Sequence, residues 1–432
     1  MRQHRTHLRS ISFLALAALA LVATSCRKEA ETFKNPNTCH ATSFTQQFED
    51  IWQGFDQCYV FWSRDTVNWD SRYARFHSIF EEFDKRPNTV TDEEYKAAWQ
   101  GVVQGLLDHH LSIALWNPIK QSRIRVGSVN DNRHTTNVFA QLNALKNQPG
   151  ITNLVSYYVD TNTSLNSVSC LLPGKNQGGY IAYLRFSSFS LSELHESHRP
   201  NKDQLEAPLR SFFGYNYTSG VTDGLVGRPD VESIIIDLRG NPGGDSRDIN
   251  LVFGNLNTRN FHFGYTRVKE GLGRLDYSSW VPFYINGSGK RISSDKPIVV
   301  LCDSNSISCS ELSCQMVKSL PNGKLIGEQT FGATCAIFAS STDNHNITYS
   351  GCFGDQNMNF SVNPKAKGEP TDKSIFSYYV YTSTFDMVTT DYKSLEAVGV
   401  TPDIVVPYDA QALADGKDPQ LEAALRYLRS NN

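Results

Sequence analysis

The stretch VESIIIDLRGNPGG, residues 231–244, joins an uninterrupted apolar run to a turn rich in glycine. A short apolar run bounded by turn residues is typical of a strand that is buried on both faces. The helical pattern SRDINLVFGNL, residues 246–256, follows it, and KPIVVLC at 296–302 repeats the arrangement before the helical SELSCQMVKSL at 310–320. Apolar strands that alternate with helices predict an α/β fold with a largely parallel sheet.

Neighbouring segments extend this predicted core in both directions. GGYIAYLRFSSF, residues 178–189, is rich in β-forming residues, and KLIGEQTFG, residues 324–332, gives a further strand. We therefore assign residues 178–410 to the α/β core. Residues 411–432 are predicted to form a C-terminal helix with Asp418 as its N-cap, because proline follows in the first turn.

The chain before this core divides into two parts. Residues 45–115 show helical periodicity and predict a small helical domain, whereas residues 116–177 form an intervening segment without a clear pattern. Aromatic side chains such as Trp52, Phe55 and Tyr59 line a peptide groove in one interpretation and fill the domain's own core in another. Their helical spacing favours the core.

The N-terminus has the features of an export signal. Residues 1–25 combine a basic start with an apolar stretch that is too short to span a membrane. Small residues precede Cys26, as in the signals of bacterial lipoproteins. This resemblance implies cleavage before Cys26, lipid on its sulfur, a tether over residues 26–44 and a place in the bacterial envelope, at the outer membrane on its periplasmic or surface face. The alternative is an ordinary secretory signal with an incidental cysteine.

Composition excludes several other classes of function. The formal net charge of the 432 residues is −3, so no basic field points to nucleic acid. The cysteines after Cys26 are spaced irregularly and contain no CxxC pair, so they do not predict a zinc site. We expect no cofactor and no metal.

The serine-rich run CDSNSISCSEL, residues 302–312, connects a predicted strand to a predicted helix. A helix N-terminus offers unpaired N–H groups and the positive end of a dipole, which suit an anionic tetrahedral intermediate. Ser308, just before the helix, is well placed to act as a nucleophile. The alternative is that Ser306, Ser308 or Ser310 serves only as a helix cap, a commoner role for serine.

Four motifs together resemble the C-terminal-processing and tricorn-core serine peptidases. They are IIIDLRGNPGG, SISCSEL, IGEQTFGAT and LEAVGVTPDIVV, in that order. The resemblance implies a core sheet of the ClpP/crotonase type with flanking helices. It also implies Ser308 as the nucleophile, with the N–H groups of Cys309 and Gly244 binding the oxyanion. Cys309 is then expected to be a free thiol, because its amide must face the oxyanion.

The residue at the position of the general base differs from that in one branch of the family. Where the processing branch has a lysine, this chain has Ala333, so a Ser–Lys pair is not expected. The tricorn-like branch uses a histidine. LLDHHLSI resembles the motif of that branch, and His110 is the match. His109 replaces the usual glycine, which leaves open which ring faces the serine. Glu396 is the match for the glutamate that supports the histidine. The alternative is a surface histidine pair; a zinc site would need a third ligand.

Many relatives carry a PDZ domain, but the chain between LLDHHLSI and GGYIAYLRF is short for one, so we predict that it is absent or reduced. Two functions remain. The first is an envelope-anchored serine endopeptidase that acts on a peptide or protein substrate and meets the membrane through its lipid. The second is an inactive peptide- or lipid-binding protein on the same fold. The sequence does not determine the substrate or the oligomeric state.

Overall fold

The structure is a computed structural model that describes residues 37–129, 133–158, 166–191, 202–214, 224–256, 260–271, 273–287, 296–343, 346–358 and 368–430. The export signal, Cys26 and most of the predicted tether lie outside the described residues.

A seven-stranded sheet forms the core. Its order is β16 (Ile404–Val405), β10 (Gly323–Gly327), β9 (Ile298–Cys302), β6 (Val231–Asp237), β5 (Tyr180–Phe186), β4 (Asn166–Pro173) and β3 (Thr152–Tyr158). The strands from β16 to β5 run parallel, and β4 and β3 continue the sheet antiparallel. The predicted α/β fold with a largely parallel sheet is confirmed.

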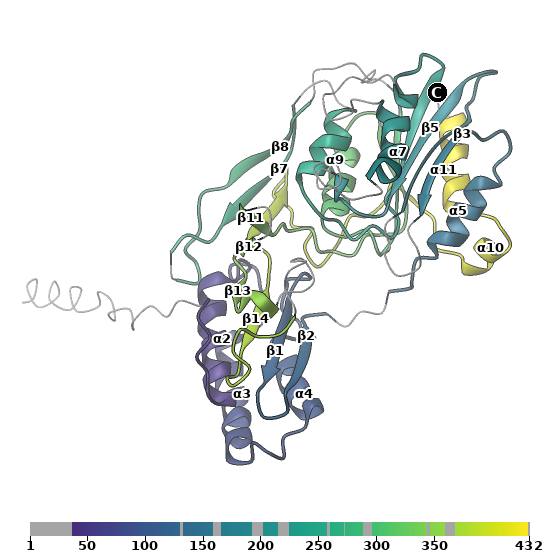
Figure 1. The fold of residues 1–432 in the computed structure, drawn as a ribbon. Helices are drawn as coiled ribbons and strands as arrows, with labels where there is room; N and C mark the ends of the chain where they lie inside the picture. Colours follow the sequence, from purple (N-terminus) through teal and green to yellow (C-terminus); the bar gives the residue numbers. More distant parts are fainter. Residues whose placement is uncertain are drawn as a thin grey trace, which may run out of the picture.

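Helices cover both faces of this sheet (Figure 1). The side chains of Ile235 and Val299 point to the face covered by α5 (Val138–Lys146) and α11 (Pro419–Ser430). The alternate side chains belong to the main core cluster, which includes residues of α7 (Lys202–Phe213) and α9 (Cys309–Ser319). Because successive side chains of a strand point to opposite faces, an apolar run such as IIID is needed to bury both. The short α10 (Ala410–Ala414) precedes α11, in which Asp418 accepts a hydrogen bond from the Leu421 amide as the predicted cap.

A second unit lies below the core in Figure 1. Its helices are α2 (Phe44–Cys58), α3 (Trp69–Lys85) and α4 (Asp92–Val103), so the predicted N-terminal helical region is present. The aromatic side chains of α2 are buried and pack on one another and on α3, as their spacing predicts. These helices pack beside a four-stranded antiparallel sheet in the order β13 (Phe353–Gly354), β14 (Tyr378–Tyr381), β1 (Ser112–Asn117) and β2 (Ser122–Gly127).

These pairings divide the chain differently from the sequence-based boundaries. The sheet of the second unit takes two of its strands from residues 353–381, which the sequence analysis placed in the α/β core. Conversely, α5, β3 and β4 come from the segment 116–177 and join the core. Strand pairing between distant segments is not visible in a local pattern, which is why a division by position along the chain misses it.

Smaller elements complete the described structure. A three-stranded antiparallel sheet has the order β15 (Phe385–Thr389), β7 (Phe261–Val268), β8 (Val281–Ile285), and a hairpin joins β11 (Phe338–Asp343) to β12 (Asn346–Ser350). The predicted helix 246–256 is shorter than expected: α8 (Arg247–Ile249) continues as a π-helical turn over Asn250–Gly254.

Among the described residues, no helix has the length and apolar character needed to cross a bilayer. All eight cysteines in the described part are free thiols, and the expectation for Cys309 is confirmed.

Candidate active site

Ser308 lies where two neighbouring parallel strands end. β6 and β9 pair in register, and the loops that follow them, residues 238–246 and 303–308, meet at the same edge of the sheet. In open α/β sheets, sites form at the carboxyl ends of the strands. Ser308 immediately precedes α9 and has φ 58° and ψ −117°, a backbone conformation that a residue with a side chain rarely adopts.

The other serines of the run have structural contacts. Ser306 Oγ donates to the Leu238 carbonyl at 2.8 Å, and Ser310 Oγ donates to the Asn241 carbonyl at 2.8 Å. Both side chains are fully buried, whereas Ser308 is half-buried. Ser308 is also the N-cap residue of α9, and its amide donates to Glu311, but its positive φ differs from the extended backbone of an ordinary capping serine.

The glycine turn after β6 packs directly on the loop that carries Ser308. Gly243 has φ 92°, and a Cβ placed on it would lie 2.7 Å from the Ser308 Cβ and 2.9 Å from the Cys309 nitrogen. Only glycine allows this close approach. Asn241 fixes the turn: its Oδ1 accepts from the Gly243 amide, its Nδ2 donates to the Phe186 carbonyl, and its own carbonyl accepts from the Ile307 amide.

Two amides at this junction have no protein acceptor. In the described part of the chain, the N–H groups of Gly244 and Cys309 donate to no protein group. The two residues are in contact, since the Cys309 thiol donates to the Gly244 carbonyl at 3.0 Å. Burial raises the pKa of that thiol to about 12, so it stays protonated and can keep this bond. A pair of free amides beside a nucleophile is the arrangement that binds an oxyanion.

Glu311 holds Ser308 against the loop that follows β10. Its carboxylate accepts from the backbone amides of Ser308, Gly332 and Ala333 and from the Thr330 hydroxyl. Burial raises the pKa of Glu311 to about 7, although these four donors favour its ionised form. Ala333, at the position of the family's lysine, is buried, and its carbonyl accepts from the Ser308 amide at 3.1 Å. The described structure thus has a methyl group where a Ser–Lys pair would need an amine.

His110 lies two residues before β1, in a buried group of polar side chains. Its own amide donates to Asp108 Oδ1 at 2.9 Å, and its ring Nδ1 lies 3.5 Å from Ser383 Oγ. Burial lowers the pKa of His110 below the usual 6.5, while the Asp108 charge opposes this shift. The ring of His109 has different neighbours: its Nδ1 lies 3.3 Å from the Phe331 carbonyl, and it packs against the Phe331 ring.

Glu396 comes close to His110 but bonds mainly to backbone. Its Oε1 accepts from the His109 amide at 2.9 Å, and its Oε2 accepts from the amides of Thr334 and Cys335, both at 2.8 Å. Burial, with the nearby Asp108 charge, holds the pKa of Glu396 well above its usual range.

The nucleophile and histidine regions border one short segment, residues 333–335. At its first residue the Ala333 carbonyl receives the Ser308 amide. At its last residue the Cys335 carbonyl lies 3.5 Å from the hydroxyl of Ser383, which also contacts the His110 ring. The five residues predicted from the sequence, Ser308, His110, Glu396, Gly244 and Cys309, therefore fall around one junction of loops.

The same residues could be considered as metal ligands. Asp108, His110 and Glu396 present ligand atoms that lie within 4.8 Å of one another. Both carboxylates are already used, because Asp108 accepts four hydrogen bonds, from the His110 amide, the Thr382 hydroxyl and the amide and hydroxyl of Ser383. Glu396 is likewise surrounded by N–H and O–H donors. A cation would have to displace these donors, so the group fits a hydrogen-bond network better than a metal centre.

A second serine–histidine–carboxylate group lies nearby and was not foreseen from the sequence. His134 Nε2 lies 3.3 Å from Ser304 Oγ and 2.7 Å from Glu328 Oε2. Both contacts use one nitrogen, and the buried Nδ1 has no partner in the described structure. A relay needs the acid on one ring nitrogen and the hydroxyl on the other. This group therefore clamps the chain around His134 to the β9–α9 loop and is a poorer catalytic candidate.

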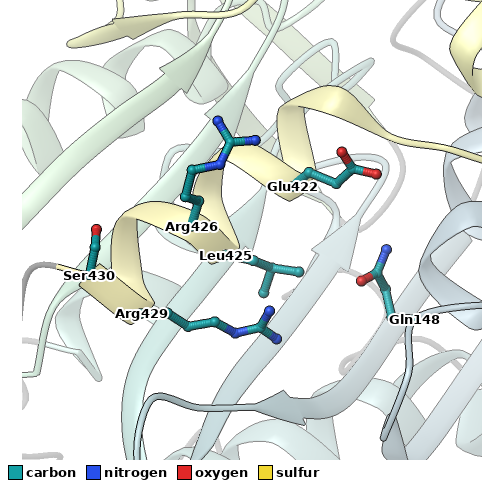
Figure 2. A pocket seen from close by; sticks show the side chains of 6 residues that line it. All are labelled: Gln148, Glu422, Leu425, Arg426, Arg429 and Ser430. Atoms are coloured by element: carbon teal, nitrogen blue, oxygen red, sulfur yellow. The ribbon is translucent and has the colours of Figure 1, made fainter.

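A shallow pocket of about 460 Å³ lies away from this junction. Figure 2 shows its lining side chains, which come from α11 and from Gln148 after α5. Within the pocket, Arg429 already donates to the Pro173 carbonyl. None of the residues around Ser308 contributes to it, so the pocket is not part of the candidate site.

Comparison with known proteins identifies the family of this chain and structures that share its fold. A family model described as peptidase family S41 matches residues 180–406, more than half of the chain. A solved structure of a candidate peptidase from Parabacteroides merdae is 19% identical and covers 90% of this chain and 98% of that chain, with a TM-score of 0.58. Mature CPAF complexed with lactacystin is 11% identical and covers 90% and 97%, with a TM-score of 0.53. At these identities the structures establish a shared fold. No curated protein matches this chain.

Proposed function

Because this chain belongs to peptidase family S41 and is a serine-type peptidase, we propose that it is an endopeptidase that cleaves peptide bonds by acyl transfer at Ser308. The observation that carries this assignment is the pair of amides, of Gly244 and Cys309, that have no acceptor in the described chain and adjoin a serine at a strained bend. A serine that merely caps a helix needs neither feature.

In the proposed mechanism, Ser308 Oγ attacks the carbonyl carbon of the scissile bond while its proton passes to His110. The carbonyl oxygen becomes an oxyanion and receives hydrogen bonds from the Gly244 and Cys309 amides. His110 then gives the proton to the leaving amine, and water repeats the sequence to release the acyl group. Burial keeps His110 neutral at physiological pH and so ready to accept the proton.

Glu396 has a supporting part in this proposal. Its contacts with the His109, Thr334 and Cys335 amides fix the backbone on both sides of the site. Removing it is expected to loosen the site as a whole rather than to delete one proton acceptor.

A fluorophosphonate probe, which labels activated serines, tests the assignment. We expect labelling of the purified protein, no labelling of Ser308→Ala, and labelling of His110→Ala slowed by roughly 10²–10⁴-fold, the usual contribution of a general base. Ser304→Ala is the matched control, because Ser304 also lies beside a histidine but outside the proposed site. Loss of labelling in Ser304→Ala with retention in Ser308→Ala would move the nucleophile to the second group.

The alternative of a binding protein without catalysis makes a different prediction for the same experiment. The unmodified protein would then fail to react with the probe and would instead bind an intact peptide or lipid. Membership of a peptidase family favours the enzyme.

We further propose that the protein is held at the bacterial envelope by lipid on Cys26. The support is the order of basic, apolar and small residues before Cys26. After expression in a bacterial host, the full chain should partition into the detergent phase of a phase-separating detergent, and Cys26→Ala should move it to the aqueous phase. Equal partitioning of the two forms would exclude the anchor.

A further inference from the structure

The ring of His110 has a side-chain neighbour that the sequence analysis did not identify. Ser383 lies in the turn between β14 and β15, and its hydroxyl is 3.5 Å from His110 Nδ1. The same hydroxyl donates to Asp108 Oδ1 at 3.0 Å, and the Ser383 amide donates to Asp108 Oδ2 at 2.8 Å. Ser383 and Asp108 are both fully buried.

The pairing of β1 with β14 explains why these residues meet. The antiparallel register places Ser112 opposite Tyr381. Continuing that register by two residues beyond the start of β1 and the end of β14 brings His110 opposite Ser383. The contact is therefore a consequence of the strand pairing rather than of a side chain that happens to reach across a gap.

We infer that Ser383 and Asp108 are the positioning residues of the base: Asp108 orients the Ser383 hydroxyl, which in turn accepts from His110 Nδ1–H. This inference rests on the proposed function of His110. Glu396 then has a different task, that of holding the backbone, because its hydrogen bonds in the described structure come from three amides and the Thr334 hydroxyl.

The proton positions follow from this chain of donors. Asp108 has only acceptors when ionised, so Ser383 donates its single proton to Asp108 and presents a lone pair to Nδ1. The imidazole then carries its proton on Nδ1 and leaves Nε2 free to take the Ser308 proton. When Nε2 is protonated, the positive ring is stabilised through Ser383 by the negative charge of Asp108. The Cys335 carbonyl, 3.5 Å from Ser383 Oγ, is a competing acceptor on the same side.

A matched pair of variants distinguishes the positioning of His110 from a role limited to hydrogen bonding with the buried Asp108 carboxylate. Thr382 also donates its hydroxyl to Asp108, at 2.6 Å, but in the described structure it makes no hydrogen bond with His110. Thr382→Val therefore removes one hydroxyl from Asp108 and serves as the control for Ser383→Ala. Ser383→Thr keeps the hydroxyl and should restore part of what Ser383→Ala loses.

The measured quantity is the second-order rate constant of fluorophosphonate labelling. We expect Ser383→Ala to lower it by roughly 10- to 100-fold, a part of the full contribution of a general base. Thr382→Val should stay within about threefold of the unmodified protein, as expected for a contact that acts only on stability. Equal losses in the two variants, or no loss in Ser383→Ala, would overturn the inference.

The pH profile supplies a readout that a purely structural role does not change. The titratable groups around the ring are Asp108, which raises the pKa of His110, His109, which lowers it, and Glu396 close by. Asp108→Asn removes the group that raises it, so the acid limb of the labelling profile should move to lower pH. An unmoved limb in a folded Asp108→Asn protein would contradict the inference.

The two proposals fail in distinguishable ways. If labelling survives in Ser308→Ala or is undiminished in His110→Ala, the proposed function fails. If those variants behave as expected but Ser383→Ala matches Thr382→Val, only the positioning inference fails. Thermal unfolding of each variant shows whether it is folded. If Ser383→Ala does not fold, the labelling rate of Ser383→Thr, which keeps the hydroxyl, is compared with that of Thr382→Val.

Discussion

At the scale of single residues, the backbone of Ser308 is the most informative feature of the site. Its positive φ is unfavourable for a residue with a Cβ, by an amount of order 1–3 kcal/mol. Glu311 and Ala333 hold this conformation through hydrogen bonds to and around the Ser308 amide. Strain that the surroundings maintain at one serine is consistent with a functional position, whereas a capping serine usually has an extended backbone.

This strain predicts a difference in stability between two variants of Ser308. Ser308→Gly should be more stable than Ser308→Ala by about 1 kcal/mol, because glycine adopts positive φ without a steric cost. Urea unfolding of both proteins measures the difference. Equal stability, or a more stable alanine variant, would show that the bend is not strained.

A second prediction at this scale concerns pH. Burial lowers the pKa of His110 below 6.5, and the base must be neutral to act, so labelling should be retained down to a half-maximum below pH 6.5. The free energy of unfolding should also fall as the pH falls, because a histidine with a lowered pKa in the folded protein binds its proton more readily in the unfolded chain. A half-maximum near pH 7 would instead assign the limb to Glu311, whose pKa is raised to about 7.

At the scale of elements, the turn after β6 and the loop after β9 act as one unit. Asn241 bonds to three different segments, through its side chain to Gly243 and Phe186 and through its carbonyl to Ile307. The position of the Gly244 amide relative to Ser308 therefore depends on one buried side chain. Neither strand alone would hold the two amides of the proposed oxyanion site together.

Asn241→Ala should accordingly reduce both stability and reactivity. It leaves the Gly243 amide and the Phe186 carbonyl unsatisfied in a buried place, at a cost of about 1–3 kcal/mol each. Ser310→Ala removes only a hydroxyl from the same turn and is the milder comparison. Denaturant unfolding and the labelling rate are measured together, and an Asn241→Ala protein that labels as fast as Ser310→Ala would contradict the coupling.

At the scale of the whole molecule, buried charges connect the C-terminal helix to the edge of the sheet that carries Ser308. Arg239, at the start of the glycine turn, donates to Asp237 and to Asp418 at the N-terminus of α11. All three side chains are almost completely buried. Helix α11, which covers one face of the sheet, therefore helps to hold the turn that carries Gly244.

Two helix caps test this connection. Asp418→Ala removes a cap and a partner of buried Arg239, so it should cost about 3–5 kcal/mol of unfolding free energy. Asp409→Ala removes only the cap of α10, bonded to the Ala412 amide, and should cost about 1 kcal/mol. Chemical denaturation gives both values; similar costs would mean that Arg239 does not depend on α11.

The sequence by itself determined the parallel core, the strand–turn–helix around Ser308 and the C-terminal helix capped by Asp418, because these depend on neighbouring residues. Apolar runs, glycine turns and capping side chains act over a few positions, and a local pattern records them. Only the tertiary structure decided that β13 and β14 join β1, and that Ser383 meets His110 from 273 positions away. Such contacts follow from strand register across the fold, and the short segments that make them carry no mark of their partners.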